Sequence, residues 1–171
     1  MKYIIISIIV LLTSCSNDTA NNTNGAISST SRLASEVGID ILKQGGNAFD
    51  AIVATGFTLA VTSPANGNIG GGGFLVAQTE NGEVFSLDFR EEAPAESYET
   101  MFLDENNEYS RELALFSHKS SGVPGTVDGL VKIFNDYGSG KFTLEEILAP
   151  AINYAENGHK TVSYTHLTLP T

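Results

Sequence analysis

Apolar residues recur at helical spacing soon after residue 30. Leu33, Val37 and Ile41 follow one another about a turn apart, as in a helix that packs one face on a core. Ser31 comes just before this run, where its hydroxyl can accept a hydrogen bond from a free N–H of the first turn. Gly45-Gly46 follows the run and is typical of a helix end. The pattern predicts a helix between Ser31 and Gly45.

Three further stretches have helical patterns: about Ala48 to Val61, about Thr126 to Tyr137, and from Thr143 to a stop at Gly158. The first is rich in alanine and apolar nearly all round, which is typical of a buried helix. In the last, Thr143 and Glu146 have the spacing of a capping box. Pro150 either kinks that helix or opens a new one.

A β-hairpin is predicted between the second and third helices. Strand-forming residues occur in Phe74–Val76 and again in Val84–Leu87. Asn81-Gly82 lies between them and favours a tight two-residue turn, because both residues accept positive φ. Gly70–Gly73 precedes the hairpin, and a glycine run is found where a backbone bends sharply or approaches another group closely. The second strand brings Arg90 to a loop beside this glycine-rich wall.

Composition and charge narrow the classes of protein. The chain has 171 residues, of which 42% are hydrophobic and 17% charged, as expected for one globular domain. Nine basic residues stand against twenty acidic ones, so the formal net charge is −11. A nucleic-acid partner would require clustered lysine and arginine. The sequence therefore predicts no nucleic-acid binding.

The N-terminus has the pattern of a secretory leader. Lys2 precedes an apolar run, residues 3–12, that is too short to span a bilayer. The run ends in LTSC, which resembles the lipobox of bacterial lipoproteins and makes Cys15 the candidate lipidation site. Residues 1–14 would then be the signal peptide and residues 15–25 a polar tether. The resemblance implies a lipid-anchored protein of the bacterial cell envelope, on its periplasmic or extracellular face. A plain secretory signal with an incidental cysteine is the alternative.

Motifs for cofactors and metals are missing from the sequence. No Gly-Lys-Ser or Gly-Lys-Thr occurs, which excludes a P-loop. The glycine run precedes a strand, whereas the dinucleotide fingerprint follows one. His118, His159 and His166 lack metal-ligand spacing. No cofactor and no metal are expected.

Several long motifs together resemble one enzyme family. NIGGGGF and LDFREEAPA, with LASEVGIDILKQGGNAFDAIVAT upstream and SGVPGTVDGL and LAPAINYAENG downstream, are similar to the large-subunit core of γ-glutamyltranspeptidases (glutathione hydrolases). The resemblance covers about Ala26 to Gly158 and assigns residues 26–159 to the N-terminal part of that subunit. It implies an α+β fold, the αββα four-layer sandwich of N-terminal-nucleophile hydrolases, incomplete in this chain.

The same resemblance gives Arg90 a role. In the family, the arginine of the motif that matches FREEAP binds the α-carboxylate of the γ-glutamyl group, so Arg90 is the candidate substrate-binding residue. A planar guanidinium suits this task, because it can pair with a carboxylate through two hydrogen bonds. The alternative is an ordinary surface ion pair with Glu91 or Glu92.

No credible catalytic nucleophile lies in the chain. N-terminal-nucleophile enzymes use a residue freed by autocatalytic cleavage, and in this family it is a threonine in a TTH-type motif that opens the small subunit. Thr165-His166 mimics that motif, but Tyr164 replaces the first threonine and the pair comes too early. Residues 160–171 also depart from the family pattern and are interpreted as an off-pattern tail, either a truncation scar or foreign sequence.

The resemblance therefore implies a fragment of an enzyme. The complete protein would cleave the γ-glutamyl amide of glutathione or related compounds and transfer the group to water or an acceptor amine. Its partners would be that substrate, the small subunit of the same precursor, and a membrane reached through the lipid anchor. Related N-terminal-nucleophile acylases are a second enzymatic reading. A non-catalytic surface lipoprotein that binds amino-acid-like ligands is the alternative from another class.

Overall fold

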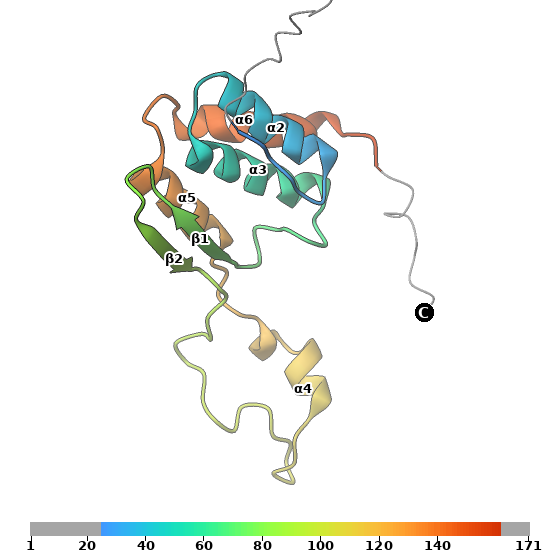
Figure 1. Cartoon of the computed structure of the whole chain (residues 1–171). Coiled ribbons are helices and arrows are strands. Elements are labelled where there is room, and N and C mark those ends of the chain that lie inside the picture. The colour runs from blue at the N-terminus through green and yellow to red at the C-terminus, as the bar shows by residue number, and fades with distance from the viewer. Residues whose placement is uncertain (1–24, 162–171) are drawn as a thin grey trace, which may run out of the picture.

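The computed structural model describes residues 25–161 (Figure 1). Its elements, in chain order, are α2 (Arg32–Lys43), α3 (Ala48–Thr62), β1 (Phe74–Gln78), β2 (Val84–Asp88), α4 (Arg111–Phe116), the 3₁₀ turn η1 (His118–Ser120), α5 (Thr126–Tyr137) and α6 (Leu144–Asn157). All four helices predicted from the sequence are present, as is the hairpin. Both the leader with Cys15 and the Thr165-His166 pair lie outside the described residues.

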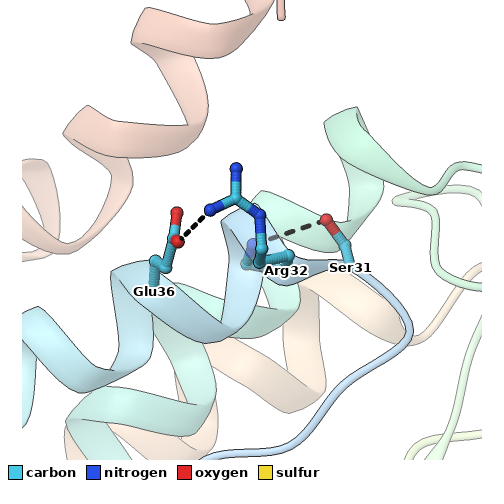
Figure 2. Close-up of polar contacts among 4 residues, drawn as sticks. Ser31, Arg32 and Glu36 are labelled. Atoms are coloured by element: carbon cyan, nitrogen blue, oxygen red, sulfur yellow. Dashed lines mark hydrogen bonds and ion pairs between the residues drawn. The ribbon is translucent and has the colours of Figure 1, made fainter. Parts of the chain in front are cut away.

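Helix α2 begins as its sequence predicts. The Ser31 hydroxyl accepts a hydrogen bond from the backbone N–H of Ala34 at 3.4 Å. In the first turns of the helix, Arg32 Nη1 lies 2.7 Å from Glu36 Oε1, an i,i+4 ion pair on the exposed face (Figure 2). The helix is therefore closed at its N-terminus by a side-chain cap, while its opposite face, with Ala34, Val37 and Ile41, is buried.

Helix α3 forms the centre of the molecule. It packs against α2, α5 and α6, which surround it in Figure 1. Ala51, Val53 and Ala54 are completely buried, in agreement with a helix that is apolar nearly all round. The apolar core continues from α3 into the neighbouring elements through Val37, Ile41, Leu75, Leu130, Ile133, Ile147 and Ala151.

Helix α6 confirms the predicted capping box. The backbone N–H of Glu146 donates to the Thr143 hydroxyl at 3.2 Å, and the N–H of Thr143 donates to Glu146 Oε2 at 2.8 Å. Pro150 lies inside this single helix, so it does not open a new one. Gly158 ends the helix with φ of 77°, a left-handed conformation that suits glycine.

The hairpin is confirmed, but its turn differs from the prediction. The strands pair antiparallel, with Leu75 opposite Leu87. Gly82 has φ of 88°, whereas Asn81 does not have positive φ. The N–H of Gly82 bonds the Thr79 carbonyl at 2.9 Å, and the N–H of Thr79 bonds the Glu83 carbonyl at 2.9 Å. The connection is thus a three-residue loop, in which a turn over residues 80–81 is followed by one left-handed glycine.

The two faces of the hairpin have different surroundings. Leu75 points into the core, and Phe85 stacks on Tyr137 of α5 with ring centres 4.4 Å apart. On the opposite face, Phe74, Val76 and Val84 are 64–76% exposed. The described part of the chain is therefore an α+β arrangement with helices on one side of a two-stranded sheet. No helix in residues 25–161 is long and apolar enough to cross a membrane.

Residues 93–122, here called the protruding segment, extend away from the helices between β2 and α5 (Figure 1). The segment carries α4 and η1, two short elements that the sequence patterns did not predict. Neither has a buried residue. Glu92 and Val123 pair at its base, with N–H to carbonyl distances of 3.2 and 2.8 Å.

Candidate functional site

The candidate site is built around Arg90, directly after β2. The hairpin ladder continues one residue pair beyond the strands, because Gly73 and Phe89 exchange backbone hydrogen bonds of 3.3 and 3.0 Å. Asp88 Oδ1 then accepts the backbone N–H of Arg90 at 2.9 Å. The main chain at Arg90 is thus fixed by the Gly73–Phe89 hydrogen bonds before it and by the hydrogen bond of its own N–H.

Glycines press against this backbone from two directions. A Cβ atom built on Gly72 would lie 2.7 Å from the Cα of Arg90, closer than two non-bonded carbon atoms approach each other. A Cβ atom built on Gly125 would overlap the carbonyl oxygen of Phe89. Only residues without a side chain allow the three backbones to meet at this distance. The sequence prediction that Arg90 lies against a glycine-rich wall is therefore confirmed.

The N-terminus of α5 is joined to the same wall. The backbone N–H groups of Gly125 and Thr126 both donate to the carbonyl of Gly71, at 2.9 and 3.0 Å. No side chain caps this helix. The Gly71 carbonyl instead satisfies two of the N–H groups that a helix start leaves free.

Arg90 lines an open hollow of about 550 Å³. One wall comes from the glycine run and the loop after β2, with Gly70 and Arg90. The facing wall comes from the protruding segment, with Phe102 and Lys119. Lys119 Nζ lies 3.3 Å from the hydroxyl oxygen of Tyr98 and 5.8 Å from the centre of its ring. The hollow therefore has two cationic side chains contributed by separate segments, and two carboxylates, Glu91 and Glu92, in the same lining.

The guanidinium of Arg90 is available for a ligand. Within residues 25–161 it makes no hydrogen bond and no ion pair, and neither Glu91 nor Glu92 is paired with it. The surface ion pair considered as an alternative is thus not formed here. The residue itself is exposed. An unpaired fork of donors in a hollow can receive a carboxylate without first losing an internal partner.

A second hollow of about 550 Å³ lies along α4 and, unlike the Arg90 hollow, has no basic residue in its lining. The charged residues in its lining are Asp104, Glu105 and Glu112. The backbone N–H groups of Glu108 and Asn106 donate hydrogen bonds to Asp104 and lower its pKa below the ordinary value, so this carboxylate stays ionised. An anionic ligand is repelled there, which leaves the Arg90 hollow as the better of the two for a carboxylate.

Two features of the site were not predicted from the sequence. One is Lys119, which lies far from Arg90 in the chain and belongs to no pattern. The other is the role of α5 in the site. Gly125 and Gly129 are four residues apart and share a helix face, and this spacing could have indicated a face without side chains. Among the described residues, no three histidine, cysteine, aspartate or glutamate side chains form a group that could hold a metal ion.

Comparison with known proteins gives this geometry a family context. The sequence model of the Gamma-glutamyltranspeptidase family matches residues 34–170. A glutathione hydrolase proenzyme of Escherichia coli (strain K12) is 45% identical over 134 residues, which cover 78% of this chain and 23% of that protein. The chain thus spans about a quarter of the length of the curated relatives it matches.

Solved structures agree with the sequence match. The gamma-glutamyltranspeptidase of Helicobacter pylori superposes with a TM-score of 0.75 at 47% identity, over 79% of this chain and 38% of that one. The gamma-glutamyltranspeptidase of Pseudomonas nitroreducens, in complex with L-DON, gives a TM-score of 0.77 at 45% identity, over 83% and 42% of the two chains. A match over most of the sequence, at such identity and with the same backbone arrangement, leads to one conclusion: this chain belongs to the gamma-glutamyltranspeptidase family.

Proposed function

We propose that the protein is a glutathione hydrolase in which this chain supplies the site for the substrate α-carboxylate. The observation that carries the proposal is the unpaired guanidinium of Arg90, fixed at its backbone and open to a hollow. Family membership supports a γ-glutamyl compound as the substrate. The reaction cleaves the γ-glutamyl amide and passes the group to water or to an acceptor amine.

The chemical steps require a nucleophile from another part of the protein. A threonine hydroxyl, deprotonated by its own α-amine, attacks the γ-carbonyl carbon. The amide C–N bond breaks, the leaving amine takes the proton, and a γ-glutamyl ester remains. Water or an acceptor amine then attacks the ester and restores the hydroxyl. Throughout, Arg90 holds the α-carboxylate through two charge-assisted hydrogen bonds, so that the γ-carbonyl stays in place.

The four-layer αββα sandwich belongs to the same proposal. Helices cover one face of the β1–β2 hairpin, as they cover the outer face of each sheet in such a sandwich. The other face carries exposed Phe74, Val76 and Val84. In the complete protein a second sheet packs on these side chains.

The substitution Arg90→Lys tests the carboxylate role. In the full-length enzyme, KM for γ-glutamyl-p-nitroanilide should rise about tenfold or more, because lysine cannot form the planar pair of hydrogen bonds. Steady-state kinetics measure the change.

The matched control is Arg32→Lys. Arg32 is also exposed but is paired with Glu36 on α2, so the same substitution there should leave KM unchanged (Figure 2). If KM and kcat/KM of Arg90→Lys stay within about twofold of the wild-type values, a difference of about 0.4 kcal/mol, Arg90 does not bind the carboxylate.

A further inference from the structure

Phe89, the residue before Arg90, is held in a notch made by glycines. Its carbonyl carbon would lie 2.8 Å from a Cβ atom on Gly125, and its ring atom Cε2 would lie 2.8 Å from a Cβ atom on Gly73. The ring packs against the apolar core. Side chain and main chain of Phe89 thus fit into spaces that exist only because these positions lack a Cβ atom.

Gly129 forms the deepest part of the notch. It is a residue of α5, one turn after Gly125. A Cβ atom on Gly129 would overlap Cγ of Phe89 and lie 2.6 Å from both its Cβ and its Cδ2. The contact falls at the base of the side chain, where rotation of the ring gives no relief. Any side chain at residue 129 must therefore force Phe89 and α5 apart.

The displaced main chain carries Arg90 with it. Phe89 is the last residue that the hairpin holds by backbone bonds to Gly73, and Arg90 follows at once. Gly72 lies against the other side of this main chain, because a Cβ atom built on Gly72 would lie 2.7 Å from the Cα of Arg90. The main chain at residues 89 and 90 is therefore enclosed between the glycine run and α5, with no free space on either side.

We infer that Gly129 and Phe89 are positioning residues for Arg90: the fit of the Phe89 side chain against the bare face of α5 sets where the guanidinium stands in the hollow. The inference rests on the proposed function, because it gives Arg90 its task. A guanidinium that binds a carboxylate depends on its exact placement, and a shift of about 1 Å in such a group can cost on the order of a hundredfold in rate. Gly129 thus acts on the substrate only through Arg90.

The first experiment substitutes Gly129→Ala in the full-length enzyme. KM for γ-glutamyl-p-nitroanilide should rise about tenfold, while kcat stays within about threefold, because the nucleophile is untouched. Alanine is a better helix former than glycine, so α5 itself is not weakened. The matched control is Gly38→Ala on α2, where the new Cβ overlaps Oγ1 of Thr55 on α3 and its three nearest atoms belong neither to α5 nor to Phe89. That variant should keep the wild-type KM.

A second variant covers the case in which Gly129→Ala does not fold. Phe89→Ala empties the notch without adding bulk, so the fit of the ring against α5 is lost and KM should rise in the same way. A normal KM in Phe89→Ala would overturn the inference. So would a Gly129→Ala enzyme whose kcat falls while its KM stays normal.

A double-mutant cycle separates this inference from the proposed function. If Gly129 acts through Arg90, Gly129→Ala should leave KM unchanged within about twofold in an Arg90→Ala background. If Arg90→Ala alone has no effect on KM, the proposed function fails. If Arg90→Ala raises KM and Gly129→Ala raises it further by its full factor, the proposed function stands and the positioning role fails.

Discussion

At the scale of single residues, Asp50 shows how a buried carboxylate joins two parts of the fold. It is fully buried at the start of α3. Its Oδ2 accepts the backbone N–H of Asn47 at 3.0 Å, and both of its oxygens lie 3.2 Å from the N–H of Ser139. Asn47 in turn donates to the Tyr137 carbonyl at 2.7 Å. The start of α3 is thereby attached to the chain that leaves α5.

Replacing this residue by alanine should destabilise the protein strongly. Asp50→Ala leaves two partly buried backbone N–H groups without this acceptor, and we expect the free energy of unfolding to fall by about 2–4 kcal/mol. Denaturant titration of the full-length protein measures it. Asp40→Ala is the control, because Asp40 forms only an exposed pair with Lys43 and should change stability by less than about 0.5 kcal/mol. Equal losses in the two variants would show that Asp50 does not stabilise the fold by attaching the start of α3 to the chain that leaves α5.

At the scale of elements, the capping box of α6 makes that helix sensitive to acid. The backbone N–H and the hydroxyl of Thr143 hold the pKa of Glu146 below its ordinary value of 4.5. Because the pKa is lower in the folded state, the cap stabilises the protein fully above about pH 4.5 and less as the pH falls through the folded-state value.

The variant Glu146→Gln tests this dependence. Glutamine keeps a hydrogen-bonding oxygen but does not titrate. The wild type should therefore lose stability more steeply than the variant when the pH is lowered from 7 to 3, as measured by urea unfolding at each pH. Parallel stability curves for the two proteins would show that the Glu146 carboxylate does not contribute through its charge.

The elements differ in how well the sequence predicts them. Helices α2, α3 and α6 have side-chain caps at their starts, so local chemistry defines where they begin, whereas α5 starts without one. Asn81-Gly82 predicts a turn correctly but the wrong turn type, because strand register also depends on Thr79 and Glu83. Helix α4 is short and has no apolar face packed on a core, so no periodicity indicates it. The spacing of Gly125 and Gly129 indicates a bare helix face, but that Phe89 packs on this face depends on tertiary structure.

At the scale of the whole molecule, exposed apolar side chains gather on the hairpin and on the protruding segment within residues 25–161. The outer face of the hairpin has Phe74, Val76 and Val84, and the protruding segment has Tyr109 and Phe116, the last 80% exposed. Exposed apolar faces of this kind are typical of surfaces that another layer covers. They also favour association when that layer is missing.

Residues 16–171 on their own should therefore behave as an unstable unit. We expect the purified piece to bind a hydrophobic dye, to show a broad thermal transition and to leave γ-glutamyl-p-nitroanilide unhydrolysed. The full-length enzyme, as control, should bind little dye and unfold cooperatively. A sharp melt of the isolated piece would show that its core is sufficient without a further layer.

The Glu92–Val123 pair makes the protruding segment a module with fixed ends. Because these two residues exchange both backbone hydrogen bonds, the chain leaves and re-enters the body of the protein at one point. Insertions or deletions between them leave the backbone at Arg90 and the start of α5 in place. The same segment forms the wall of the hollow that contains Phe102 and Lys119. Changes in the length and content of this segment can thus alter that wall without moving the glycine-enclosed arginine.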